Sequence, residues 1–212
     1  MSGIQHLLGM NDPRLSEEHN AIRERVLREV AMHFKCYEGF IKKDSRVLDV
    51  GIGPGYTAEY IKQNRSDINI EGLDILDLRQ TKSVNITLYK GTRFPWQEKV
   101  FDLALLFYTL HHIKWPGLIL DEVTRTTRGG ILIIEEFRAE EIDVPQDEQY
   151  EADVHLALGI PMHIEQSYFS MSELEKLFVD KKLAIVEKRK LKSLSPRKIE
   201  KRLYVLAHNY GN

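Results

Sequence analysis

Three glycines at alternate positions, close behind an acidic residue, form the pattern in this chain that most clearly indicates ligand binding. Asp49 lies in the apolar run 47–50, and Gly51, Gly53 and Gly55 follow it. Glycine has no Cβ, so the backbone can turn tightly and a ligand can reach main-chain N–H groups that a side chain would cover. The spacing differs from the G-x-G-x-x-G of dinucleotide-binding turns, so a pyrophosphate is not the first choice of ligand. An anionic or hydrogen-bond-accepting ligand is the expected occupant.

A second acidic residue strengthens this interpretation, because glycine also occurs at strand-to-helix turns for purely conformational reasons. Asp74 ends the apolar segment 68–74, about twenty residues after the glycines, where nucleoside-binding sheets place a carboxylate on the ribose hydroxyls. Asp74 is therefore the expected ribose ligand, with Ile75 beside it.

Two further segments extend the pattern. Residues 101–113 read Phe-Asp-Leu-Ala-Leu-Leu-Phe-Tyr-Thr-Leu-His-His-Ile, and residues 128–135 read Arg-Gly-Gly-Ile-Leu-Ile-Ile-Glu. Together with the glycine turn and Asp74, these segments resemble the motifs of the class I S-adenosylmethionine-dependent methyltransferases, in the order in which that family carries them. The first motif of the family, D/E-x-G-x-G-x-G, is matched in full at 49–55.

The resemblance implies S-adenosyl-L-methionine as the cofactor and S-adenosyl-L-homocysteine as its product. The residues that it assigns to cofactor binding are Asp49, Gly51, Gly53, Gly55, Asp74, Ile75, Thr92, Arg93, Phe107 and Tyr108. One position departs from the family, which usually has a Gly-Asp pair after the third strand to receive the adenine amino group. Here Gly91 is followed by Thr92 and Arg93, so Thr92 would offer a hydroxyl or a backbone group instead.

Two consecutive histidines are the candidates for catalysis. Methyl transfer from a sulfonium is an in-line displacement, so the protein mainly positions a nucleophile and excludes water. A base is needed only if the attacking oxygen or nitrogen carries a proton. His111 and His112 follow the fourth predicted strand, and at most one of them can face the pocket. Either imidazole would suit a base, and the alternative is that this turn packs under the cofactor or caps the next helix.

Acidic residues are abundant between 135 and 153, and His155 and His163 follow them. No metal-ligand spacing recurs among these residues, so no metal site is predicted, and an acidic run between elements is usually a solvated loop. The resemblance offers another interpretation, because the family commonly inserts its substrate-shaping segment after the fifth strand. Residues 137–170 would then form a mobile cap whose apolar residues, among them Leu156 and Ile160, wall the acceptor pocket.

The C-terminal region is basic. Its positively charged residues are Lys188, Arg189, Lys190, Lys192, Arg197, Lys198, Lys201 and Arg202. Such a patch can hold RNA phosphates. The favoured alternative is a set of solvated lysines on edge strands, where they discourage aggregation. The net charge of −2 gives no independent indication of a polyanionic partner.

Apolar strands and amphipathic helices alternate along the chain, as is typical of parallel strands covered on both faces. A long helix is expected from Ser16 to about Glu38, because Ile22, Val26 and Val30 recur on one face. The other expected helices cover 56–64, 116–127 and 171–180, and the expected strands cover 47–50, 68–74, 86–90, 101–107, 131–136, 184–190 and 201–208. Between 74 and 86 there is room for only a turn or two of helix. The resemblance implies a Rossmann-like, doubly wound, seven-stranded α/β sheet that is mostly parallel, with the last strand antiparallel.

Length and composition favour one domain, since 212 residues with 42% hydrophobic content can bury an adequate core. We expect an N-terminal helical segment at 1–40, a core at 41–136, the cap insertion at 137–170, and a C-terminal helix and strands at 171–212. The lone cysteine, Cys36, excludes an internal disulfide and fits a reducing cytosol. No signal peptide or long apolar run is visible, so a cytoplasmic protein without membrane association is expected.

Taken together, these patterns favour a methyltransferase that acts on a small-molecule acceptor, because the N-terminal helix and the cap can close over the cofactor. One alternative is an RNA methyltransferase that uses the basic C-terminal region. Another is a non-catalytic S-adenosylmethionine-binding regulatory protein, which the missing acid at Thr92 and the weak case for a base leave open.

Overall fold

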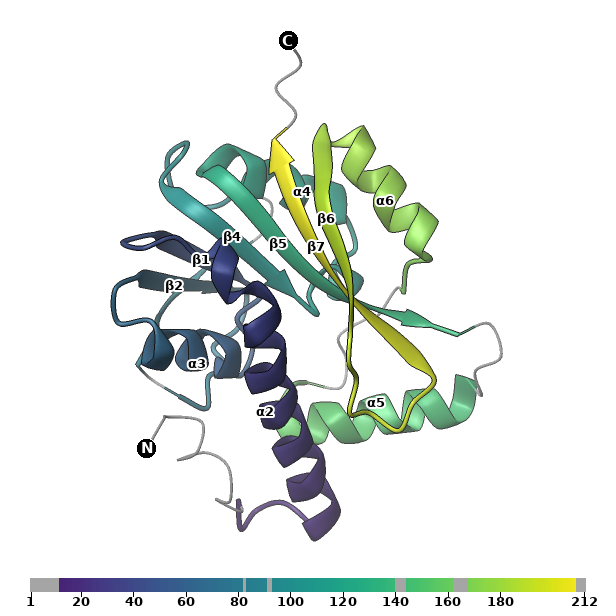
Figure 1. Cartoon of the computed structure of the whole chain (residues 1–212). Coiled ribbons are helices and arrows are strands. Elements are labelled where there is room, and N and C mark those ends of the chain that lie inside the picture. Colours follow the sequence, from purple (N-terminus) through teal and green to yellow (C-terminus); the bar gives the residue numbers. More distant parts are fainter. Residues whose placement is uncertain (1–11, 82, 91–92, 140–143, 162–167, 209–212) are drawn as a thin grey trace.

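A seven-stranded mixed sheet forms the centre of the molecule (Figure 1). The computed structural model describes residues 12–81, 83–90, 93–139, 144–161 and 168–208. The strands are β1 (Arg46–Val50), β2 (Asn69–Asp74), β3 (Asn85–Leu88), β4 (Phe101–Phe107), β5 (Thr127–Arg138), β6 (Leu183–Leu191) and β7 (Ile199–His208). Their order is β3-β2-β1-β4-β5-β7-β6, and β7 runs antiparallel to both of its neighbours. The predicted fold class is confirmed.

Helices cover both faces of this sheet, as Figure 1 shows. They are α2 (Glu17–Tyr37), α3 (Tyr56–Asn64), α4 (Pro116–Thr126), α5 (Val144–Leu158) and α6 (Met171–Asp180). Local sequence sets their starts: the Ser16 hydroxyl accepts from the N–H of His19 at 3.1 Å, and Ser170 and Glu173 form a capping box. Between β2 and β3 no helix occurs among the described residues 75–81 and 83–84, so this crossover is shorter than usual.

The acidic segment differs from the solvated loop that its composition suggested. Residues 144–158 form α5, and its inward face carries charged side chains, since Asp147 is 3% exposed and Glu151 is 9% exposed. Helix α5 lies against α2 below the sheet (Figure 1). These two helices therefore form the floor beneath the carboxyl ends of the parallel strands.

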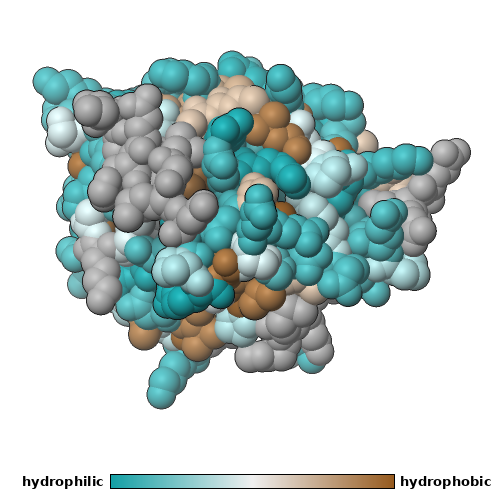
Figure 2. Space-filling view, turned by 90° about the horizontal axis from the view of Figure 1, so that it is seen from below, coloured by the Kyte–Doolittle hydropathy of each residue, from teal (hydrophilic) through white to brown (hydrophobic). Residues whose placement is uncertain are grey.

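The surface of this lower side is mixed in character. Figure 2 shows hydrophilic residues interspersed with small hydrophobic areas. The exposed apolar residues of α5 are Val144 and Leu156. Among the described residues, no helix combines the length and the apolar character needed to cross a membrane.

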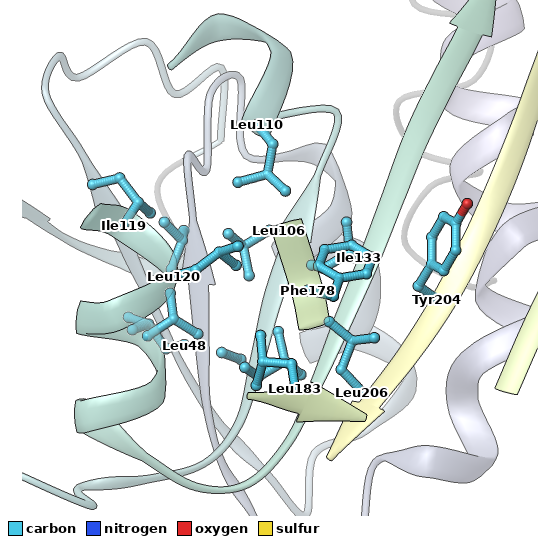
Figure 3. Close-up of a cluster of buried hydrophobic side chains, with 14 of the residues drawn as sticks. Leu48, Leu106, Leu110, Ile119, Leu120, Ile133, Phe178, Leu183, Tyr204 and Leu206 are labelled. Atoms are coloured by element: carbon cyan, nitrogen blue, oxygen red, sulfur yellow. The ribbon is translucent and has the colours of Figure 1, made fainter. Parts of the chain in front are cut away.

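Two apolar clusters hold the layers together, one on each face of the sheet. On one face, Leu106 and Ile133 of the sheet pack with Leu120 of α4 and Phe178 of α6 (Figure 3). On the other face, the C-terminal half of α2 and helix α3 pack against β1, β4 and β5. Because β4 and the middle of β5 are buried on both sides, their sequences are nearly continuous apolar runs. The rigid sheet that results fixes the positions of the loops at its carboxyl edge.

Candidate active site

A cavity of about 260 Å³ lies at the carboxyl edge of the sheet. Its walls come from the glycine turn after β1, from the ends of β2 and β4, from α2, and from the end of α5. Ligands of open α/β sheets bind at this edge. The predicted site residues that line the cavity are Gly51, Gly53, Asp74, Ile75, Phe107, Tyr108 and His112.

The glycine turn places backbone, without side chains, against the cavity. Gly51 and Gly53 have φ angles of +71° and +49°, a region that side chains rarely allow. A Cβ at Gly51 would lie 2.4 Å from Cγ2 of Thr109, whereas a Cβ at Gly53 would meet no atom closer than 3.9 Å. A side chain at Gly51 would therefore clash with the protein. One at Gly53 would occupy the space that a ligand needs.

Asp74 faces the glycine turn from the end of β2. Its Oδ2 accepts from the Gly53 N–H at 2.9 Å, and its Oδ1 accepts from the Ile75 N–H at 2.7 Å. Burial raises the pKa of Asp74, and these backbone hydrogen bonds oppose that increase. The carboxylate is thus held at the cavity wall by the backbone itself.

Three other predicted cofactor residues lie away from the cavity wall. Asp49 is buried within β1, where burial and the nearby Asp74 carboxylate raise its pKa to about 8. Gly55 begins α3. Arg93 is exposed and lines a separate cleft with Trp96 and Arg125, so the structure does not bring it together with the other predicted residues. Thr92 lies outside the described residues.

The two histidines lie on a short 3-10 turn, Leu110–His112, with their ring centroids 4.1 Å apart. His111 Nδ1 lies 2.6 Å from Oε2 of Glu135, and its ring stacks on Tyr168. Burial lowers the pKa of His111, but the Glu135 carboxylate outweighs burial, and the pKa is raised overall. His112 instead lines the cavity. His111 is therefore buried in a close pair with Glu135, and His112 faces the cavity.

Helix α2 contributes two polar residues to the cavity that the sequence analysis did not single out. Glu29 and His33 both line it. Nδ1 of His33 lies 3.1 Å from the Tyr108 hydroxyl, and Nε2 lies 2.8 Å from the backbone oxygen of Lys192. Their spacing of four residues on a helix that was already predicted was the available signal, since residues i and i+4 share a helix face.

Buried ion pairs lie behind this wall. Lys201 Nζ lies 2.6 Å from Oε2 of Glu29 and 3.1 Å from Oε1 of Glu136. Arg197 pairs with Glu136 at 3.0 Å and also with Asp147 and Glu151 of α5. The prediction of solvated edge-strand cations is wrong for Lys201 and Arg197. Strand β7 lies inside the sheet, and both cations neutralise acids that would otherwise be buried alone.

Comparisons with known proteins agree with this geometry. A family model described as a methyltransferase domain matches residues 18–188. The chain belongs to the class I S-adenosylmethionine-dependent methyltransferase family. No curated protein matches the sequence of this methyltransferase.

Three solved structures resemble this methyltransferase in fold. A methyltransferase from Methanosarcina mazei is 15% identical with a TM-score of 0.62, over 82% of this chain and 96% of its own. One from Aquifex aeolicus is 19% identical with a TM-score of 0.62, over 93% and 100%. The methyltransferase in a complex with the Haloferax volcanii Trm112 activator is 15% identical with a TM-score of 0.63, over 92% and 99%. At these identities the likeness shows the fold alone.

Proposed function

We propose that this methyltransferase binds S-adenosylmethionine in the cavity and transfers its methyl group to a small-molecule acceptor. The observation that carries the proposal is the arrangement of Gly53 opposite Asp74. The Gly53 N–H donates to the Asp74 carboxylate at 2.9 Å, and the space where a Cβ of residue 53 would lie is open to the cavity. This arrangement fits a nucleoside, whose ribose hydroxyls donate to a carboxylate while its other polar groups meet backbone.

Each wall of the cavity has a distinct role in this proposal. Asp74 accepts from the ribose hydroxyls, and the glycine turn lets the methionine portion approach the backbone. Ile75 provides an apolar contact for the adenine, with Thr92 as the proposed partner of its amino group. Asp49 is buried within β1 and does not contact the cofactor. It affects the site through its electrostatic interaction with the Asp74 carboxylate.

The cofactor, when bound, supplies an electrophilic methyl group that needs no further activation. The chain has to hold an acceptor beside that group and exclude water. Val26 and Val30 of α2 and Leu158 of α5 form an apolar wall for this purpose. We assign to His112 the orientation of the acceptor, because it faces the cavity. Nδ1 of His111 is taken up by Glu135 and the ring is buried, so we assign to His111 the role of holding the turn.

The charges of the C-terminal region support a small acceptor over RNA. Three of the exposed cations there are paired with acids: Lys188 with Glu175 at 2.8 Å, Lys190 with Glu200 at 2.8 Å, and Arg189 with Glu187. Arg197 and Lys201 are buried in the ion pairs behind the cavity. A cation that already has an acidic partner adds little to phosphate binding, which depends on the release of counterions.

Calorimetry with S-adenosylhomocysteine tests the cofactor assignment, and S-adenosylmethionine should bind as well. The acceptor class is tested by incubating the protein with radiolabelled S-adenosylmethionine and either a small-molecule extract or total tRNA. We expect label to enter the small-molecule fraction. Label in tRNA would favour the RNA alternative, and cofactor binding without labelling of either fraction would favour a non-catalytic binding protein.

A further inference from the structure

Tyr108 and His33 form a hydrogen-bonded pair on the wall of the cavity. The Lys192 carbonyl can only accept, so the His33 nitrogen 2.8 Å from it, Nε2, carries the hydrogen. Nδ1 of His33 then has the free electron pair, and the Tyr108 hydroxyl donates to it across 3.1 Å. The tautomer of His33 is therefore fixed with its basic nitrogen toward Tyr108 and the cavity.

Charges around His33 suit a proton acceptor. Burial lowers the pKa of His33, and the ring is 3% exposed, so the imidazole is neutral near pH 7. The charged groups that face it are Glu29 on its own helix, Lys201 on β7 and Glu136 on β5. The two carboxylates stabilise an imidazolium once a proton arrives, while Lys201 opposes it.

The backbone of Tyr108 is held in an uncommon conformation. Its φ angle is +56°, in the left-handed region that a bulky side chain rarely adopts, and its N–H donates to the Ile134 carbonyl at 2.7 Å. Such conformations occur at functional sites, where the surrounding structure enforces them. The Lys201 ammonium lies 5.0 Å from the centre of the Tyr108 ring. Burial raises the pKa of the Tyr108 hydroxyl, and Lys201 opposes that increase, so the hydroxyl keeps its proton until a base accepts it.

Most of the other side chains that line the cavity are apolar, although Glu29 and His112 are polar. Val26, Val30, Ile113, Leu158 and Ile160 line the cavity together with Tyr108 and His33. A molecule that fits there would place an apolar frame against these side chains. Its one polar group would meet the Tyr108 hydroxyl.

We propose that Tyr108 and His33 form a proton relay for the hydroxyl group of an apolar acceptor, such as a phenol. This inference rests on the proposed methyl transfer. The acceptor hydroxyl gives its proton to the Tyr108 oxygen while Tyr108 gives its own proton to Nδ1 of His33. The acceptor oxygen uses the freed electron pair to bond the methyl carbon, and the pair of the broken carbon–sulfur bond goes to sulfur. The proton on His33 leaves to solvent with the products.

The relay is tested with a matched pair of probes, 4-ethylphenol and 4-ethylaniline, which differ only in hydroxyl against amine. We expect the wild type to convert 4-ethylphenol with S-adenosylmethionine into 4-ethylanisole, in preference to methylating the aniline. In His33→Gln and in Tyr108→Phe, turnover should fall at least about a hundredfold, the usual minimum for the loss of a general base. Affinity for S-adenosylhomocysteine should change less than about threefold. His19→Gln, on the same helix but outside the cavity, is the matched control and should keep wild-type turnover.

Two measurements separate the relay from a structural role. The ring nitrogen resonances of His33 should show a hydrogen on Nε2 and a pKa below the ordinary histidine value of about 6.5. Because the relay needs neutral His33, turnover should fall as pH drops through that pKa, and this limb should vanish in His33→Gln.

Several results would overturn the relay. They are a hydrogen on Nδ1 of His33 in the free protein, a preference for the aniline, unchanged turnover in both variants, or cofactor binding without methylation of 4-ethylphenol. If S-adenosylhomocysteine does not bind the wild type, the proposed function itself fails, so the two failures are distinguishable.

Discussion

The two sides of the cavity handle buried charge in opposite ways. On the glycine-turn side, which comprises Gly51, Gly53, Asp49 and Asp74, burial and mutual repulsion raise the pKa of Asp49 to about 8. On the α2–β7 side, which comprises Glu29, Glu136, Arg197 and Lys201, burial also acts on Glu136. There, however, Lys201 and Arg197 outweigh burial and lower the pKa of Glu136.

This difference distinguishes the acids beside the proposed cofactor site from the acids that hold the fold together. The α2–β7 side is balanced by its own cations, so its charges join helices to the sheet. On the glycine-turn side, two carboxylates lie close to one another, and a positively charged ligand such as a sulfonium would relieve their repulsion. A raised acid pKa beside a cavity is therefore the better indicator of a binding site.

The largest expected effect comes from filling the glycine turn. Gly53→Val should make binding of S-adenosylhomocysteine undetectable by calorimetry. Valine fits poorly at a φ of +49°, and its side chain would occupy the cavity. Gly39→Val is the control, because a Cβ at the exposed Gly39 meets nothing within 4 Å. Retained binding in Gly53→Val would remove the basis for placing the cofactor on this turn.

The next effect concerns the pH dependence of stability on the glycine-turn side. The pKa of Asp49 rises from 3.8 to about 8 on folding, so folding favours its protonated form. Its contribution to stability is present below about pH 4 and is lost as pH rises through 8, with a slope of up to about 1.4 kcal/mol per pH unit. Relative to the wild type, Asp49→Asn should gain stability across this window. Urea unfolding at a series of pH values measures the difference, and parallel profiles for the two proteins would contradict the assignment.

On the α2–β7 side, removal of one cation should destabilise the fold. Lys201→Met leaves Glu29 and Glu136 buried without their shared partner and should cost about 3–5 kcal/mol in the free energy of unfolding. Lys190→Met removes a cation of similar geometry, 2.8 Å from Glu200 but 69% exposed, and should cost about 0–1 kcal/mol. Equal losses in the two variants would show that burial does not distinguish these pairs.

The smallest effect should come from Asp74. Asp74→Ala should weaken binding of S-adenosylhomocysteine by about 1–3 kcal/mol, the scale of hydrogen bonds to a charged group. Asp77→Ala removes a nearby carboxylate that pairs with Arg79 at 2.7 Å, and it should leave the affinity unchanged. If calorimetry gives the same affinity for both variants, Asp74 does not hold the ribose.

The sequence predicted the glycine-turn side well because its residues are close together in the chain. One strand, the glycine turn, helix α3 and the next strand bring Gly53 within hydrogen-bonding distance of Asp74. The spacing between the glycines and Asp74 in the sequence was therefore enough to predict that they lie near one another. The sheet was predictable for a related reason, since strands buried on both faces are continuous apolar runs.

The α2–β7 side was not predictable in the same way, because its contacts join distant segments. Glu29 and Lys201 are 172 residues apart. Helix α5 was missed because its buried face carries Asp147, Glu151 and His155 at four-residue intervals. An amphipathic helix is recognised by apolar residues that recur every three or four positions, and on the buried face of α5 charged residues stand at these positions. Their burial depends on Arg197, whose position inside the fold only the topology of β7 reveals.

The position of β7 also has a consequence for biosynthesis. A ribosome makes Glu29 early and Lys201 172 residues later. Until β7 emerges and pairs with β5, the nascent chain has acids on α2 and β5 without their cation, and an open strand edge that invites aggregation. The glycine-turn side can form during synthesis, whereas the α2–β7 side is completed last.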